Sequence, residues 1–144
     1  MDNGRLTTDA TKLEITYRFD CDILTTPELV ELFKAAGLGG RTGEKILHAF
    51  KNSQLICLAY AGERLVGTSR AITDWEYHAL IYDVAVHPEF QGQGFGKAML
   101  GSLLSRLKVW RVMLVAGADV QPFYERSGFK PYPDVMARLD WDNL

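Results

Sequence analysis

A glycine-rich loop is the part of this sequence best suited to bind a ligand. It follows a branched apolar strand, and it precedes a run in which apolar residues recur every three or four positions, as on one face of a helix. The first backbone N–H groups of a helix lack intrahelical partners, and the helix dipole adds about half a positive charge there. We therefore expect the loop to cradle a phosphate or pyrophosphate. Its residues are Gln91, Gly92, Gln93, Gly94, Phe95, Gly96 and Lys97.

The spacing of this loop differs from two common phosphate loops. A dinucleotide fingerprint needs a third glycine where Lys97 stands, and a P-loop needs glycine at Gln91 and serine or threonine at Ala98. What remains is Gln91-x-x-Gly94-x-Gly96, which resembles the pyrophosphate-binding signature of the GNAT superfamily of acyl-CoA-dependent N-acyltransferases. The alternative is a turn without a ligand, but alternating glycines cost conformational entropy unless the backbone must approach something closely.

A second motif, Phe123 to Phe129, supports the resemblance. It indicates a short helix in which Asp119 is the N-cap, Pro122 lies in the first turn and Gly128 ends the helix. In the GNAT superfamily the corresponding helix presents a tyrosine to the sulfur of the cofactor, and the matching residue here is Tyr124.

The resemblance extends from residue 65 to residue 141. Within the superfamily, residues 81–94 and 123–124 look like the serotonin N-acetyltransferases of plant plastids and their bacterial relatives. The resemblance implies an enzyme that transfers an acetyl group from acetyl-CoA to a primary amine by direct attack, with Tyr124 as the general acid. It departs from the superfamily pattern at Gly117, where many members carry an asparagine that contacts the cofactor.

The strand before the loop is implied to hold the pantetheine arm through its main chain. The arm would hydrogen-bond the backbone along Val84, Ala85 and Val86, while the side chains of these residues belong to an ordinary core strand. A backbone N–H at a bulge near Val84 or Val86 could polarise the thioester carbonyl.

The acceptor amine also needs a base and a binding surface. Asp83 is the best candidate base, because a carboxylate inside an apolar strand must have a partner or a raised pKa. Asp74 and Glu76, in the preceding loop, could act through water instead. Together with Trp75 and Tyr82 they would suit a cationic aromatic amine, although the same cluster could simply pack a loop onto its sheet.

Composition limits the other classes of function. The chain has 144 residues, which predicts one domain spanning residues 1–144. A net charge of −2 argues against nucleic acid as a partner, and no apolar run approaches the length of a membrane span. The N-terminal residues carry no targeting pattern, so we expect a cytoplasmic protein, with a small-molecule amine or a lysine as acceptor and a homodimer as a further expectation.

The cysteines and histidines lack the spacing of a metal site, so no metal is expected, and Cys21 and Cys57 are interpreted as free thiols. Two alternatives to direct transfer stay open. One is a cysteine-dependent acyltransferase that uses Cys57, His78 and Asp83. The other is a non-catalytic acyl-CoA-binding sensor or interaction module.

The pattern of elements predicts a mixed α/β fold. We expect a mostly antiparallel central sheet flanked by helices, with a parallel strand pair that splays apart near Val86 and Val115 and admits the ligand there. The expected strands are 13–19, 55–60, 65–72, 80–86 and 111–115, with a closing hairpin of 129–132 and 135–141. The expected helices are 25–36, 42–51, one after the glycine loop and the short one before Gly128.

Overall fold

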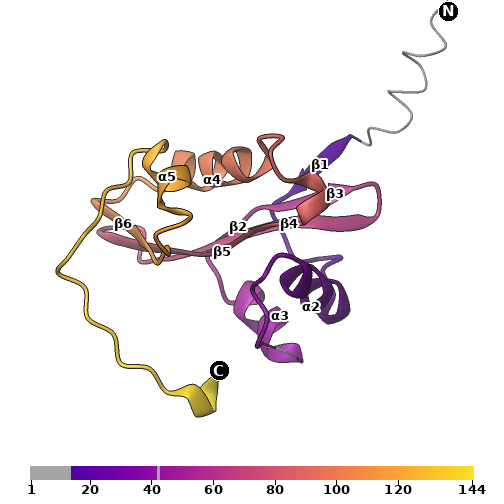
Figure 1. The fold of residues 1–144 in the computed structure, drawn as a ribbon, viewed down its shortest axis with the longest axis horizontal. Helices are drawn as coiled ribbons and strands as arrows, with labels where there is room; N and C mark the ends of the chain where they lie inside the picture. The colour runs from indigo at the N-terminus through magenta and orange to yellow at the C-terminus, as the bar shows by residue number, and fades with distance from the viewer. Residues whose placement is uncertain (1–13, 42) are drawn as a thin grey trace, which may run out of the picture.

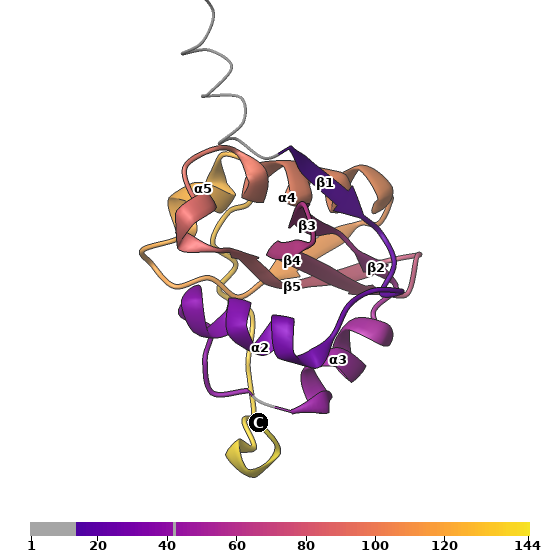
Figure 2. The ribbon, with the colours of Figure 1, turned by 90° about the vertical axis from the view of Figure 1, so that its right-hand side faces the viewer.

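A computed structural model of the protein describes residues 14–41 and 43–144. In this part of the chain six strands form one sheet with the spatial order β1-β3-β4-β5-β6, while β2 pairs with β4. Helices α4 and α5 cover one face of the sheet, and α2 and α3 cover the other (Figures 1 and 2). The predicted mixed α/β fold, mostly antiparallel with one parallel pair, is therefore confirmed.

The strands are short on the first edge of the sheet and long at its centre. All neighbouring pairs are antiparallel except β5 and β6, which run parallel. The strands are β1 (Ile15–Arg18), β2 (Leu55–Ile56), β3 (Leu58–Ala61), β4 (Arg64–Thr73), β5 (His78–Val86) and β6 (Arg111–Leu114). The predicted strand 55–60 is thus broken at Cys57, and the predicted ends at Leu13 and Thr42 lie outside the described residues.

The helices lie close to the segments that their sequence signals predict, although α5 ends at Glu125, before the predicted stop at Gly128. They are α2 (Thr26–Ala35), α3 (Glu44–Lys51), α4 (Phe95–Arg106) and α5 (Gln121–Glu125), with 3₁₀ turns η1 (Pro88–Phe90) and η2 (Trp141–Asn143). At the start of α2 the Glu28 carboxylate accepts the Thr25 backbone N–H at 2.7 Å, as in a capping box. Helix α5 is preceded by Val120 as its N-cap, so the predicted N-cap at Asp119 is wrong by one position. No described helix is both long and apolar enough to span a membrane.

Two apolar cores lie on the two faces of the sheet. Met99, Leu100 and Leu103 of α4 are buried against one face, and Leu29 and Phe33 of α2 are buried against the other. The burial of these α4 side chains fixes the start of the helix beside the end of β5, so the glycine loop has a defined position.

The two parallel strands separate at their carboxyl ends. Strand β5 pairs with β6 from His78 to Ile81, and the last pair is Ile81 with Leu114. Beyond Ile81, β5 continues to Val86 without a partner on that side in the described residues. The predicted splay is therefore present, and it leaves main-chain groups of β5 available to a ligand.

The prediction of a closing hairpin is wrong. Residues 129–132 and 135–141 form no strand in the described chain, and the segment leaves the sheet after β6 and runs toward the α2–α3 side (Figure 1). Pro131 and Pro133 lack backbone N–H donors and restrict the residues before them, so they weaken any ladder in the first of these two stretches. The outer edge of β6 is consequently unpaired in this part of the chain.

Candidate active site

The glycine loop connects the end of β5 to the start of α4 through the turn η1. Gly92 and Gly94 have φ angles of 77° and 90°, in the left-handed region that favours glycine, and Gly94 is the N-cap of α4. The Gln91 side chain donates a hydrogen bond from Nε2 to the Val86 carbonyl at 2.9 Å, which ties the loop to the strand. The first backbone N–H groups of α4 have no acceptor within the helix, so they are available to a ligand at this loop.

A cavity of about 770 Å³ lies at this point, between the splayed strands, the glycine loop and α5. Gly96 forms part of one wall and lies close to two side chains. A Cβ added to it would be 3.4 Å from the Phe123 ring and 3.5 Å from Val86. The predicted residues that line the cavity are Tyr82, Asp83, Val84, Ala85, Val86, Gln91, Gly92, Gly94, Phe95, Gly96, Lys97 and Tyr124. The structure therefore brings the loop, the strand and the tyrosine together around one space.

The main chain of β5 is bulged beside this cavity. Thr68 of β4 is opposite Ala85 and Arg70 is opposite Tyr82, so two residues of β5, Asp83 and Val84, face a single residue of β4. Asp83 has a φ angle of 54°, and its carbonyl accepts a hydrogen bond from Thr68 Oγ1 at 2.8 Å. The bulge expected near Val84 is therefore confirmed.

The side chains around the bulge follow the expected pattern. Val84 and Val86 pack against the core beneath α4, while Ala85 is buried in the core beneath α2. Ala85 is thus a core residue, while Val84 and Val86 are partly buried and also line the cavity.

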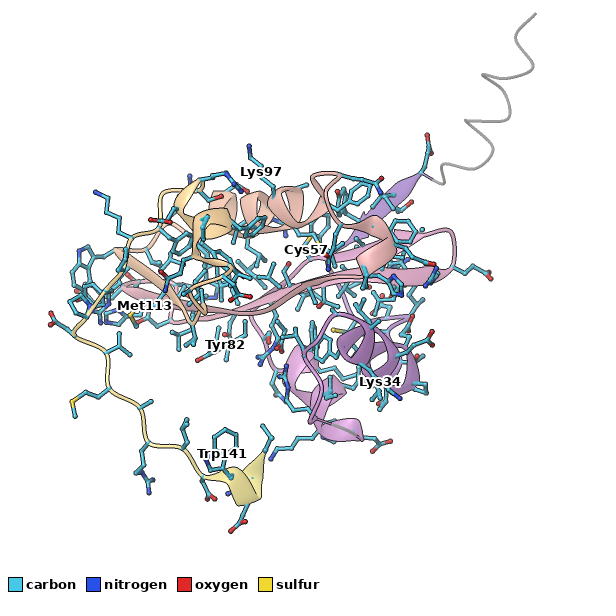
Figure 3. The ribbon with its side chains drawn as sticks, viewed as in Figure 1. Lys34, Cys57, Tyr82, Lys97, Met113 and Trp141 are labelled. Carbon is cyan, nitrogen blue, oxygen red and sulfur yellow. The ribbon has the colours of Figure 1, made fainter. Side chains whose placement is uncertain are left out.

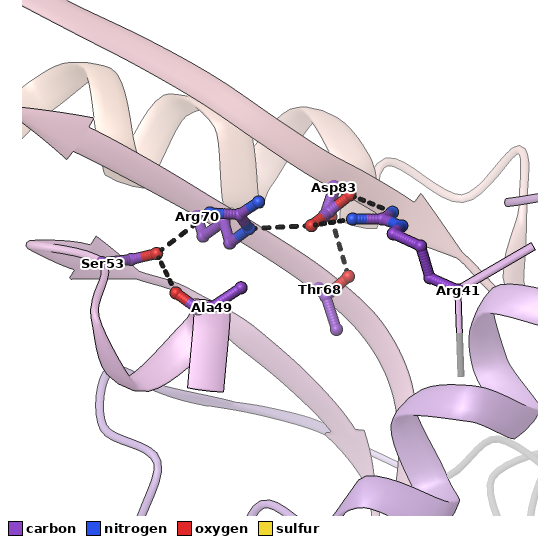
Figure 4. Close-up of polar contacts among 6 residues, drawn as sticks. All are labelled: Arg41, Ala49, Ser53, Thr68, Arg70 and Asp83. Atoms are coloured by element: carbon purple, nitrogen blue, oxygen red, sulfur yellow. Dashed lines mark hydrogen bonds and ion pairs between the residues drawn. The ribbon is translucent and has the colours of Figure 1, made fainter. Parts of the chain in front are cut away.

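The Asp83 carboxylate is held between two guanidinium groups (Figure 4). Arg41, from the loop after α2, donates to both carboxylate oxygens at 2.5 and 3.1 Å, and Arg70 of β4 donates from Nε at 2.7 Å. Only 7% of the Asp83 side chain is exposed. Burial alone would raise the pKa of Asp83, but the hydrogen bonds and charges of both arginines outweigh it and leave the pKa below its usual value.

Neither arginine was predicted from the sequence to be a residue of the site. Arg70 could have been found, since a charged residue inside the apolar run 65–72 needs a buried partner. Arg41 carried no such signal, because it lies in a glycine-rich loop far from Asp83 along the chain. Each guanidinium also packs on an aromatic ring, Arg41 over Phe33 at 5.0 Å and Arg70 over Tyr82 at 5.2 Å.

Tyr124 belongs to α5 and lines the cavity, as does Leu114 of β6. Its ring packs edge-on against Phe123 and Phe129, with centroids 5.0 and 6.1 Å away. Burial raises the pKa of the Tyr124 phenol, so the hydroxyl stays protonated at neutral pH. A rigidly packed, protonated phenol beside the cavity is suited to donate a proton.

The other acceptor-site candidates lie away from the cavity. Asp74, Trp75 and Glu76 form the turn between β4 and β5, at the end of β5 opposite the glycine loop. The Asp74 carboxylate accepts backbone N–H groups of Glu76, Tyr77 and His78 at 2.8 to 3.0 Å, and these bonds lower its pKa. Asp74 therefore shapes the turn, and only Tyr82 of this group lines the cavity.

The residues of the cysteine alternative are not brought together. Cys57 is buried in the core beneath α4, whereas Tyr82 and the ion pairs of Asp83 lie on the opposite face of the sheet (Figure 3). His78 pairs in register with Arg111 at the far end of β5. Burial also raises the pKa of the Cys57 thiol, which disfavours the thiolate that such a mechanism needs.

Replacing Cys57 with alanine will therefore leave catalytic activity in place. The substitution removes one buried sulfur and no group that can reach the cavity, so stability should fall slightly while kcat stays within about twofold. Activity measured with and without iodoacetamide checks this. Loss of turnover in a folded C57A variant would restore the cysteine mechanism.

Comparison with known proteins decides the family. The model of the acetyltransferase (GNAT) family matches residues 25–129, which include the glycine loop, the bulged strand and Tyr124. The chain belongs to this family. It is an N-acetyltransferase, and the GNAT family uses acetyl-CoA as the acetyl donor.

Relatives and solved structures agree with this placement. An uncharacterized N-acetyltransferase, ycf52, of Pyropia yezoensis is 36% identical over 121 residues, which are 79% of this chain and 70% of that protein. The chloroplastic serotonin N-acetyltransferase 2 of Oryza sativa subsp. japonica is 31% identical over 115 residues, 75% of this chain and 58% of that protein. A probable acetyltransferase from meticillin-resistant Staphylococcus aureus superposes with a TM-score of 0.78 at 25% identity, covering 88% of this GNAT chain and 98% of that one.

Proposed function

We propose that this GNAT protein transfers the acetyl group of acetyl-CoA directly to a primary amine in the cavity beside β5. The observation that carries the proposal is the convergence of three features on one space: the glycine-capped start of α4, the bulged main chain of β5 and the Tyr124 phenol. Each feature meets a different need of the donor, namely a charged pyrophosphate, an amide-bearing arm and a thioester.

The pyrophosphate would sit on the backbone N–H groups of residues 92–97. In support of this, Gly94 has a left-handed φ at the start of α4, loop residues line the cavity, and Lys97 adds a positive charge at its rim. The pantetheine arm would then extend along Val84 to Val86, where β5 has no strand on its β6 side in the described residues. This arrangement brings the thioester to the bulge and to Tyr124.

Transfer needs one attack and one proton donation. The neutral amine nitrogen attacks the thioester carbon, and a backbone N–H at the bulge stabilises the oxygen that becomes negative. The carbon–sulfur bond breaks, Tyr124 donates its proton to the departing thiolate, and the proton lost by the amine passes to water. Positioned proton donation of this kind is typically worth about a hundred- to ten-thousand-fold in rate.

In this proposal Asp83 is not the general base that the sequence suggested. Its carboxylate is already shared by two arginines and its pKa is lowered, so it is a poor proton acceptor at neutral pH. We assign it to hold Arg41 and Arg70 in place and to fix the bulge. Tyr82, Ala36 and Leu38 line the acceptor side of the cavity and favour an aromatic or alkyl amine.

A panel of amines tests the proposed function. Acetyl-CoA is incubated with the protein and arylalkylamines, polyamines or lysine peptides, and released thiol is measured. We expect turnover with at least one arylalkylamine, since the rice relative is named as a serotonin N-acetyltransferase. Tight binding of acetyl-CoA with no turnover on any amine would instead indicate the non-catalytic sensor.

Replacing Gly94 with valine will weaken acetyl-CoA binding at least tenfold, which is about 1.4 kcal/mol. The φ of 90° disfavours any branched side chain, and the added methyl groups would stand where the pyrophosphate approaches. Isothermal titration calorimetry measures the affinity.

Gly62 offers a matched control for this prediction. It lies in the β3–β4 turn with a φ of 62° and open space around it, so G62V imposes similar backbone strain away from the cavity. G62V should bind acetyl-CoA normally. Equal affinity of folded G94V and wild type would place the pyrophosphate elsewhere.

A further inference from the structure

The charges beside the bulge of β5 do not cancel. Asp83 is the only carboxylate that the side chains of Arg41 and Arg70 contact among the described residues (Figure 4). A further side-chain hydrogen bond of Arg70 goes to the neutral hydroxyl of Ser53, at 3.3 Å. Arginine stays protonated in proteins, and the lowered pKa of Asp83 keeps its carboxylate ionised. We call these three charged side chains the arginine cluster; two guanidinium groups and one carboxylate give it a net charge of +1.

The arginine cluster lies at the acceptor side of the acyl-CoA cavity. Asp83 lines this cavity, as do Tyr82, whose ring packs on Arg70, and Leu38, which precedes Arg41 in the loop after α2. Only 28% of the Arg41 side chain, 11% of Arg70 and 7% of Asp83 are exposed. Because these groups are largely removed from water, solvent screens their charge less than that of a surface pair. The net positive charge therefore acts on whatever occupies this side of the cavity.

Among the described residues, none that lines the cavity offsets this charge. Asp83 is the only carboxylate of the lining, and both arginines already share it. The side chains that pack on the arginine cluster from the neighbouring helices, Phe33 of α2 and Phe50 of α3, are uncharged. The other charged or titratable residues that line the cavity are Tyr82, Lys97, Tyr124 and Arg126. A positively charged acceptor therefore meets no free counter-ion in the described lining.

This charge matters for the acceptor, since only a neutral amine can attack a thioester. A primary amine resembles the lysine side chain, whose pKa is about 10.4, so most of it is a positively charged ammonium at neutral pH. A nearby like charge disfavours the charged form and lowers its pKa. Lysine nucleophiles of enzymes are activated by neighbouring cations in this way. A net positive charge at the acceptor side therefore promotes loss of the ammonium proton.

We propose that the arginine cluster makes the cavity selective for the neutral form of the acceptor, and that Arg41 is thereby a specificity-determining residue for amines without a second positive charge. The inference rests on the proposed function. The arginine cluster takes the place of the general base that Asp83 does not supply: the bound ammonium gives its proton to water, and the neutral nitrogen then attacks the thioester carbon. A polyamine, or a lysine flanked by other basic residues, keeps an uncompensated positive charge in the cavity and is a poor acceptor.

The pH dependence of R41Q tests this role. Glutamine removes the positive charge of Arg41 and leaves Asp83 paired with Arg70, so the arginine cluster becomes neutral. Single-turnover acetylation is measured at saturating amine, with an arylethylamine whose pKa is lowered toward neutrality by fluorine beside the amino group. We expect the acidic limb of the R41Q rate profile to lie about one pH unit above that of the wild type. At a pH below both limbs the rate should then be about tenfold lower.

Two further variants separate charge from structure. R41K keeps the positive charge, so its acidic limb should coincide with that of the wild type. R18Q breaks another arginine–aspartate pair, between Arg18 and Asp20 at 3.2 Å, in which 35% of the arginine side chain is exposed. Arg18 does not line the cavity, so the R18Q limb should also stay in place. Calorimetry should show wild-type affinity for acetyl-CoA in all three variants, which establishes that the cavity has kept its shape.

A comparison of acceptors tests the same role without any substitution, and it remains decisive if R41Q does not fold. The best arylalkylamine of the panel is compared with an analogue that bears an aminomethyl group on its ring and so carries a second positive charge. The wild-type kcat/KM should be at least about tenfold higher for the monoamine, and R41Q should narrow this ratio while R41K retains it. The acidic limb of the wild type should also follow the solution pKa of the amine across a fluorinated series.

Three results would overturn the inference while the proposed function stands. In the first, R41Q and the wild type share the same acidic limb. In the second, the limb stays at one pH for amines of different solution pKa, which marks a titrating base of the protein. In the third, the diamine is as good an acceptor as the monoamine. Absence of acetylation of every amine by the wild type would instead contradict the proposed function, and this inference with it.

Discussion

Replacing Tyr124 with phenylalanine will lower kcat by about a hundredfold or more while acetyl-CoA affinity changes little. Phenylalanine keeps the ring that packs on Phe123 and Phe129, and it removes only the hydroxyl. Burial raises the pKa of this phenol and so keeps it protonated, and Tyr124 lines the acyl-CoA cavity. The comparison uses the best amine of the panel, with kcat from steady-state rates and affinity from calorimetry.

A matched control for Y124F is Y132F. Tyr132 is an exposed tyrosine outside the acyl-CoA cavity, and its hydroxyl accepts only the hydrogen bond from Arg111 among the described residues. Y132F should retain nearly full turnover. If Y124F matches wild type in kcat while product release is shown to be fast, Tyr124 is a packing residue and another group protonates the thiolate.

Asp83 will prove a structural residue rather than a catalytic base. Replacing it with asparagine leaves the guanidinium groups of Arg41 and Arg70 without their shared carboxylate in a largely buried site. Removing one partner of a buried ion pair typically costs about 3 kcal/mol or more. Urea unfolding should therefore show a clearly lower free energy of unfolding for D83N than for the control D20N, which breaks an exposed ion pair with Arg18.

The pH dependence of this difference has a defined sign. The folded pKa of Asp83 lies below that of the unfolded chain, so its contribution to stability is complete above the ordinary aspartate pKa of about 4 and is lost as the pH falls through the lowered folded value. The gap in stability between wild type and D83N should thus be constant near neutral pH and shrink in acid. A variant of unchanged stability that loses the acidic limb of its rate profile would instead identify Asp83 as the base.

Local patterns in the sequence were sufficient for the parts of the site made by the main chain. The glycine loop and the helix start behind it depend on spacing, capping and burial within short stretches, whereas the splay after Ile81 was expected from the fold class. Tyr124 was assigned through the resemblance of its short helix to the GNAT pattern, and the structure brings it to the wall of the cavity.

Features built from distant residues could not be predicted in this way. The pairing of Asp83 with Arg41 depends on how the loop after α2 folds over the sheet, and no local pattern encodes that contact. Asp74 was grouped with the acceptor site because it is near Asp83 in sequence, yet an extended strand carries the two to opposite ends of β5. The prediction of the final hairpin was wrong for a related reason, since alternation in 135–141 indicates a strand but not which sheet edge it would join.

Direct transfer is tested most simply by mass spectrometry with trideuteroacetyl-CoA. The protein is first incubated with this donor alone and then with the best amine, and the intact protein, the free CoA and the amine product are quantified. We predict no labelled protein in the first step, and in the second one labelled amine for each CoA released. A labelled protein that passes its acetyl group to the amine, or CoA release without acetylated amine, would contradict direct transfer in the cavity beside β5.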